Sequence, residues 1–137
     1  MADFNEKISA EIENISKIVL EVKKLLMKSN LDKYQINSAA LYLHNFYNGV
    51  ENIFKQFIAE YNLKVKNSSK WHKELLDTCY LEKVINKSLY NKLKSYLQFR
   101  HFVAHSYTFN YEYELFKNLV VDLEVNYNDF YKQVLPR

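Results

Sequence analysis

The chain has 137 residues and a formal net charge of +3, and 48% of its residues are hydrophobic. This length suits one domain, and this hydrophobic content excludes an intrinsically disordered chain. The chain holds one glycine and one proline, Pro136, which disfavours a β-rich fold with many tight turns. A single cysteine, Cys79, excludes an internal disulfide and favours a reducing compartment. The mildly basic charge is compatible with RNA, with an acidic partner or with neither, so it identifies no ligand.

The sequence shows no signal-peptide pattern and no membrane-spanning pattern. The first residues, MADFNEKISAEIEN, contain acidic side chains and no apolar run, unlike a signal peptide. No stretch reaches the roughly 20 apolar residues that a membrane-spanning helix needs. We therefore predict a soluble, cytoplasmic protein without a membrane partner.

Apolar residues recur at steps of three and four in long segments, which is the spacing of amphipathic helices. The first segment runs from about residue 4 to residue 28, with the stripe Ile8, Ile12, Ile15, Val19, Val22 and Leu26. The second runs from about residue 33 to residue 61, with the stripe Ile36, Ala40, Leu43, Tyr47, Val50, Phe54, Phe57 and Tyr61. A second line, Ala39, Phe46 and Ile53, widens this apolar face. So wide a face predicts cover on two sides, by the bundle itself and by a second subunit.

The second half of the chain continues the helical pattern. A polar, basic loop at residues 63–70 precedes a short helix predicted at residues 71–81. The third long helix starts at about residue 88, with the stripe Leu89, Leu93, Tyr96, Arg100 and Val103. The fourth spans about residues 113–134, with the stripe Tyr113, Phe116, Val120, Leu123, Tyr127, Phe130 and Val134. We predict an all-α fold, a four-helix bundle with an additional short helix, in a single domain spanning residues 1–137.

Arg100 breaks the apolar pattern, because it stands where the third stripe predicts a core residue. A guanidinium group keeps its proton, so burying it requires a partner. Arg100 therefore either faces a wet interface, is held by an acid, or extends its stem along the bundle toward water. His105 follows five residues later, at about 140° around a straight helix, while Tyr107 falls on nearly the same face as Arg100. Arg100 and His105 would converge only where the helix bends or ends, or where two copies meet.

The pattern Arg-x4-His-x-Tyr, formed by Arg100, His105 and Tyr107, resembles the signature of HEPN ribonucleases, specifically the HepT-like toxins. A polar residue, His101, follows Arg100, as is common in that motif. Residues 42–54 (YLHNFYNGVENIF) resemble the HepT-like second helix, including its acidic residue at Glu51. The number and order of the predicted helices also match, so the resemblance covers nearly the whole chain.

The resemblance implies a metal-independent endoribonuclease that acts as a homodimer and needs no cofactor. Arg100 and His105 of both subunits would share one cleft. An imidazole group titrates near neutral pH and can move the proton of a ribose 2′-hydroxyl, while a guanidinium group stabilises charge on phosphoryl oxygens. The products would carry a 2′,3′-cyclic phosphate and a 5′-hydroxyl, and the RNA substrate would be a tRNA or an mRNA.

The resemblance also implies a protein partner. In HepT-like toxins the tyrosine of this motif is modified with AMP by a nucleotidyltransferase antitoxin, which implies that role for Tyr107. Added nucleotides would place bulk and negative charge where RNA must bind. Without the resemblance, Tyr107 would be interpreted as one of 12 tyrosines packing at a helix end.

Other polar residues are weaker candidates. Glu51 either pairs with Arg100 and orients it, or is a solvated surface acid. His101 and His105 have a spacing that can bind a metal on a helix, but no third ligand is evident, so we predict no metal site. His44 and His72 are expected to be surface or packing residues. The loop lysines Lys64, Lys66 and Lys70 either touch RNA phosphates or are simply solvated.

Three hypotheses remain open from the sequence. The first is a ribonuclease toxin of a type II toxin–antitoxin pair, which requires Arg100 and His105. The second is a non-catalytic HEPN module that binds substrate for a nucleotidyltransferase. The third is a structural helical dimer, which would be indifferent to replacement of His105.

Overall fold

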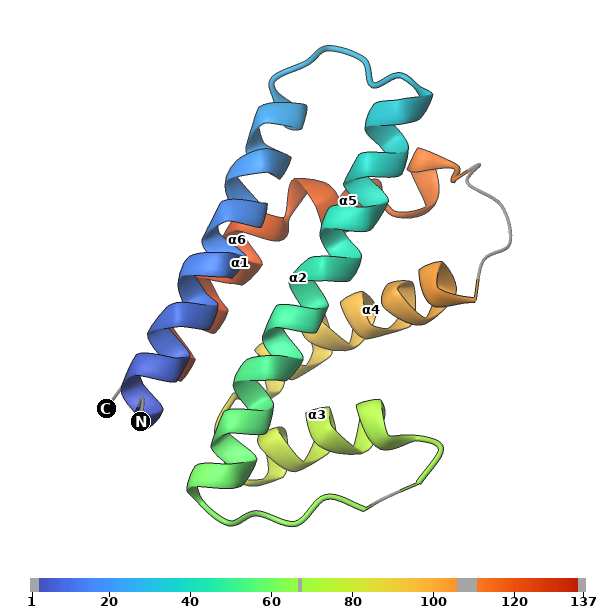
Figure 1. Ribbon diagram of the computed structural model, residues 1–137. Helices are drawn as coiled ribbons and strands as arrows, with labels where there is room; N and C mark the ends of the chain where they lie inside the picture. Colours follow the sequence, from blue (N-terminus) through green and yellow to red (C-terminus); the bar gives the residue numbers. More distant parts are fainter. Residues whose placement is uncertain (1–2, 67, 106–110, 136–137) are drawn as a thin grey trace.

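The computed structural model describes residues 3–66, 68–105 and 111–135, and Tyr107 lies outside them. Helix α1 (Phe4–Leu26) begins after Asp3, whose side chain accepts a hydrogen bond from the backbone N–H of Glu6. Helix α2 (Lys33–Glu60) begins with a capping box formed by Asp32 and Gln35. The two helices run antiparallel and lie side by side along their length (Figure 1).

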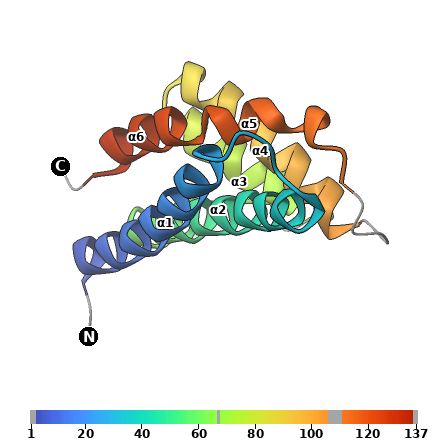
Figure 2. The ribbon, with the colours of Figure 1, turned by 90° about the horizontal axis from the view of Figure 1, so that it is seen from above.

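The remaining helices cover α2 and α1. Helix α3 (Trp71–Leu81) and helix α4 (Lys87–Ala104) both contact α2, and α6 (Leu123–Val134) contacts α1 and α4. Seen from above, α1 and α2 form one layer and the later helices lie across it (Figure 2). The described residues contain helices and no strand, so the all-α prediction is confirmed. None of the helices in the described ranges is long and apolar enough to cross a membrane.

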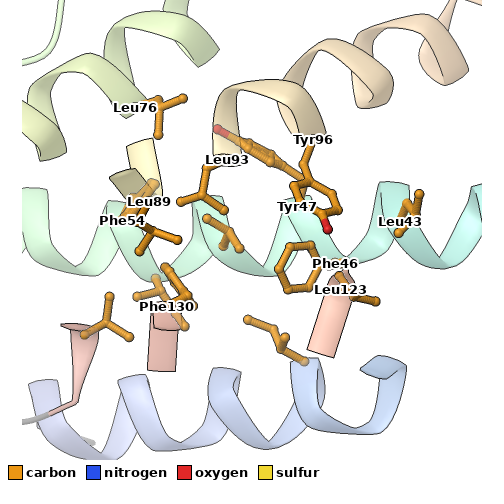
Figure 3. Close-up of a cluster of buried hydrophobic side chains, with 14 of the residues drawn as sticks. Leu43, Phe46, Tyr47, Phe54, Leu76, Leu89, Leu93, Tyr96, Leu123 and Phe130 are labelled. Atoms are coloured by element: carbon orange, nitrogen blue, oxygen red, sulfur yellow. The ribbon is translucent and has the colours of Figure 1, made fainter. Parts of the chain in front are cut away.

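Helix α2 lies at the centre of the core, so its wide apolar face does not need a second subunit to cover it. Ala39, Phe46 and Ile53, the line attributed in part to a second subunit, are fully buried within the single chain. Side chains of α2 pack on α3 and α4 on one side and toward α1 and α6 on the other (Figure 3). The width of this face therefore reflects a central helix and gives no argument for a dimer.

The predicted fourth helix is divided into three pieces, so its prediction as one continuous helix is wrong. A 3₁₀ turn, η1 (Tyr113–Leu115), is followed by α5 (Lys117–Val121) and then by α6. The Leu119 carbonyl accepts a hydrogen bond of 2.7 Å from the Tyr96 hydroxyl, which in turn accepts one of 3.0 Å from Asn126 Nδ2. A side chain that enters the backbone ladder in this way bends a helix. The predicted stripe still faces the core, because Phe116, Val120 and Phe130 are buried.

Gly49 allows α1 and α2 to approach closely. A Cβ atom built at this position would lie 2.5 Å from Cγ1 of Ile15, a fully buried side chain. We expect Gly49→Ala to lower the free energy of unfolding by about 1–2 kcal/mol, because overpacking outweighs the better helix propensity of alanine. Urea denaturation measures the change, and the loss should shrink when Ile15→Ala is introduced as well. A stabilised Gly49→Ala protein would show that the two helices separate at little cost.

Candidate functional site

Helix α4 carries the motif and directs Arg100 toward α2. Its N-cap Asn86 accepts a hydrogen bond of 2.9 Å from the backbone N–H of Leu89, and Leu89, Leu93 and Tyr96 bury one face of the helix. Arg100 is the next residue of this buried stripe, so its side chain also points inward. Only 19% of the Arg100 side chain is exposed.

Two polar side chains of α2 hold the Arg100 guanidinium group. Arg100 Nε donates a hydrogen bond of 2.6 Å to Asn48 Oδ1 and lies 3.8 Å from Glu51 Oε1. Glu51 is 3% exposed, so it is a buried acid and not a solvated one. A buried carboxylate beside a guanidinium group fixes the position of both groups. Of the alternatives left open by the sequence, the structure shows the close Arg100–Glu51 pair.

The other carboxylate oxygen of Glu51 contacts α3. Glu51 Oε2 lies 2.8 Å from His72 Nδ1, and the His72 side chain is 44% exposed. The expectation of a mere surface or packing residue therefore missed the principal contact of His72. Glu51 thus joins a residue of α4 to a residue of α3.

Asn48 and His44 extend this network along α2. With its oxygen bound to Arg100, the Asn48 amide places Nδ2 at 3.4 Å from His44 Nδ1. Asn48 was not among the predicted site residues, although His44, Asn48 and Glu51 follow at steps of four and three, which places them on one helix face. This spacing is the one feature of the sequence that could have predicted a role for Asn48.

Tyr47 is buried beside the Glu51 carboxylate. Burial, followed by the negative charge of Glu51, raises the pKa of Tyr47 well above its ordinary value, so the hydroxyl stays protonated. Its hydroxyl oxygen is buried without a hydrogen-bond partner among the described residues. Tyr96 differs, because its hydroxyl donates to the Leu119 carbonyl and accepts from Asn126 Nδ2.

This difference predicts opposite effects of the same substitution at two tyrosines. Tyr47→Phe should raise the free energy of unfolding by about 1 kcal/mol, because it removes an unpaired buried hydroxyl. Tyr96→Phe, the matched control, should lower the free energy of unfolding by about 1–2 kcal/mol, because the Leu119 carbonyl and the Asn126 amide lose their hydrogen-bond partner. Thermal and urea unfolding measure both values. Equal losses for the two variants would mean that Tyr47 makes a hydrogen bond in solution.

His105 lies at the end of α4 and is separated from the Arg100 network. It is the C-cap residue of the helix, and its backbone N–H donates to the carbonyl of His101. The rings of His101 and His105 lie 4.3 Å apart between centroids, and both residues are exposed. The structure therefore brings Arg100 to Asn48 and Glu51, and brings His105 to His101. Tyr107, the third motif residue, lies outside the described residues.

The described part of the site offers no cluster of metal ligands. Within residues 3–66, 68–105 and 111–135, no group of three or more His, Cys, Asp or Glu side chains is arranged to hold one. Cys79 of α3 is buried, and burial raises the pKa of its thiol to about 12. At neutral pH this thiol stays protonated, so it suits neither a metal ligand nor a nucleophile.

Comparison with known proteins adds a family assignment to this geometry. Residues 38–135 match a family model described as HepT-like protein. This range begins within α2 and includes all of α3, α4 and α6, and with them all the residues of the network. No curated protein and no solved structure shows a significant match to the chain.

Proposed function

Because the chain belongs to the HepT-like protein family, we propose that it is a metal-independent endoribonuclease toxin of a type II toxin–antitoxin pair. The observation that carries the proposal is the partly exposed Arg100 of α4, which Asn48 and Glu51 of α2 hold in place. The helix that carries Arg100 ends at the exposed His105. A structural helix would place an apolar residue at position 100 and would need no buried acid opposite it.

The chemistry follows from the two side-chain types. One His105 takes the proton of a ribose 2′-hydroxyl, and the 2′-oxygen forms a bond to phosphorus. The bond from phosphorus to the 5′-oxygen breaks, and a second histidine supplies the proton of the leaving 5′-hydroxyl. Arg100 stabilises the charge that gathers on the phosphoryl oxygens. The reaction leaves a 2′,3′-cyclic phosphate and requires no metal ion.

A homodimer supplies the second histidine in this proposal. Within one chain Arg100 points to α2 and His105 packs on His101, so two copies that face each other would complete a cleft with paired arginine and histidine side chains. We expect sedimentation at micromolar concentration to give twice the chain mass of 16.5 kDa. A monomer that still cleaves RNA would overturn the shared cleft.

Tyr107 is proposed as the site of neutralisation. A nucleotidyltransferase antitoxin would transfer AMP from ATP to the Tyr107 hydroxyl: the tyrosine oxygen bonds to the α-phosphorus, and pyrophosphate leaves. The added phosphate would repel RNA from the cleft. Intact-mass measurement after incubation with such an enzyme and ATP should show added AMP units on the wild type. A Tyr107→Phe protein should remain unmodified under the same conditions.

A non-catalytic module that binds substrate for a nucleotidyltransferase is the second candidate. The observation in its favour is that Arg100 is engaged by Asn48 and Glu51 within one chain, whereas the His105 ring packs on His101. Such a module would bind its ligand without breaking a bond.

One experiment separates the two functions. The purified protein is incubated with total RNA and with tRNA in excess EDTA, and the product ends are analysed by mass. Cleavage that leaves cyclic phosphate ends supports the nuclease. Intact RNA with a folded, unmodified dimer supports the binding module, whereas intact RNA with AMP already on the protein indicates a neutralised toxin.

A further inference from the structure

A hollow lies beside the Arg100 network, between the C-terminal part of α2, the loop that follows it and the start of α3. Its volume is about 460 Å³. Its apolar lining comes from Ile58, Leu63, Val65 and Leu75, and its polar edge and aromatic wall come from Lys55, Lys64 and Trp71. A space of this size with an apolar lining and cationic edge can hold a flat aromatic group attached to an anion.

The exposed charges of Lys55 and of the loop are positive, and one acid, Glu74 in the first turn of α3, accepts a hydrogen bond from Ser68 of that loop. The stretch of residues 63–72 contains three lysines, Lys64, Lys66 and Lys70, and no acid. All three are exposed, as is Lys55, and none of them takes part in an ion pair within the described part of the chain. Unpaired lysines around an apolar hollow are complementary to a polyanion.

Trp71 supplies a stacking surface at this edge. Its indole is partly exposed, and Lys55 Nζ lies 5.1 Å from the ring centroid. Trp71 begins α3, and the N-cap residue Lys70 makes no side-chain hydrogen bond to the first turn. The first turn of α3 lies at the same edge as the lysines, but it contains Glu74, whose carboxylate offsets the positive end of the helix dipole. The attraction for an anion therefore comes from the lysines.

The hollow adjoins the Arg100 network through Trp71, which lines it, and His72, the next residue of the chain. The rings of Trp71 and His72 lie 5.4 Å apart between centroids, and His72 contacts Glu51. Lys55 follows Asn48 by seven residues on the same face of α2, a rise of about 10 Å along the helix. A single strand of nucleic acid that reaches Arg100 can therefore extend into the hollow.

We propose that this hollow is a binding subsite for single-stranded RNA, in which one base stacks on Trp71 while Lys55 and Lys64 bind the adjoining phosphates. The proposal rests on the proposed function, since it takes RNA as the substrate. Stacking on an aromatic ring favours an unpaired base of any identity, and lysines contact phosphates without reading sequence. When the base stacks, the ammonium group of Lys55 moves from the indole to the phosphate. The subsite thus selects unpaired segments beside the cleaved bond.

Tryptophan fluorescence tests the subsite directly, because Trp71 is the sole tryptophan of the chain. The His105→Ala protein, which should not cut RNA, is titrated with a short oligouridylate. We expect saturable quenching, because a stacked base changes the environment of the indole. Unchanged fluorescence, with binding still detected by the anisotropy of a labelled oligouridylate, would overturn the proposal.

Matched lysine variants separate a local site from general charge attraction. Lys55→Gln with Lys64→Gln should weaken oligouridylate binding about tenfold, because two phosphate contacts are lost. Lys7→Gln with Lys17→Gln removes the same charge from exposed positions of α1, which packs on another side of α2, and should have little effect. Equal weakening by both pairs would overturn the subsite. If polyglutamate of matched charge displaces the RNA and quenches the tryptophan equally, that result would assign the hollow to an acidic protein and overturn the proposal of an RNA subsite.

A ring-substitution series and a cleavage assay complete the test. Trp71→Phe should keep most of the affinity for the labelled oligouridylate and Trp71→Leu should lose it, since only phenylalanine retains an aromatic face. In the wild-type background the lysine pair should raise KM for RNA and leave kcat nearly unchanged. Cleavage with unchanged KM would refute the subsite and keep the nuclease, whereas quenching without any cleavage would keep the subsite and refute the nuclease.

Discussion

His105→Ala is expected to lower the rate of RNA cleavage by at least about a hundredfold, since a positioned acid or base contributes roughly that factor or more. The fold should survive the change. His105 is an exposed residue at the end of α4, and surface substitutions of this kind alter the free energy of unfolding by about 0.5 kcal/mol or less. Single-turnover cleavage and urea unfolding of the same preparation measure both quantities.

His101→Ala provides the matched control for this experiment. His101 is also exposed, lies one helical turn before His105, and loses the same ring. We expect its effect on cleavage to be much smaller, because it supports the position of His105 and takes no proton itself. Equal losses for the two variants would assign the chemistry to the histidine pair. An active His105→Ala protein would reject the proposed mechanism.

Arg100→Ala is expected to abolish cleavage and also to destabilise the fold. Loss of a group that stabilises the transition state costs about a hundredfold to a thousandfold in rate. The same change leaves Glu51, which is 3% exposed, without its guanidinium partner. We expect the free energy of unfolding to fall by about 2 kcal/mol, somewhat less than for a fully buried pair because Arg100 retains contact with water.

A double-mutant cycle with Glu51→Gln separates the two effects. If the carboxylate and the guanidinium group interact as the 3.8 Å separation indicates, the stability cost of Arg100→Ala should shrink by about 1 kcal/mol in the Glu51→Gln protein. The rate loss should persist in that background, because it arises from the phosphate and not from Glu51. Additive stability changes would show that Arg100 and Glu51 do not interact in solution.

The helices were largely predictable because burial follows periodicity. The predicted stripe of α1 is buried at Ile8, Ile12, Ile15, Val19 and Val22, and the short helix at residues 71–81 has the predicted bounds. These elements follow from local spacing alone, which the sequence displays directly. The break after Val121 coincides with the hydrogen bond from the Tyr96 hydroxyl to the Leu119 carbonyl, 23 residues away, which no local pattern announces. The break at Phe116 has no such side-chain partner among the described residues.

The site was predictable to the same extent. Arg100 stands out because a charged residue interrupts an apolar stripe. Glu51 stands out only through the resemblance of residues 42–54 to the HepT-like second helix. His72 carried no signal, since it lies 21 residues from Glu51 and meets it only after α3 folds back on α2. The wide apolar face of α2 shows the same limit, because periodicity indicates that a face is covered but does not show that α1, α3 and α4 of the same chain cover it.

The two oxygens of Glu51 go to different helices, one toward Arg100 of α4 and the other to His72 of α3. A single carboxylate therefore couples the position of α3 to that of the arginine. Any ligand that binds better when α3 is held in this place also binds better when Arg100 is held there, and thermodynamic linkage makes that preference reciprocal. Binding that stabilises the position of His72 therefore also stabilises the position of Arg100.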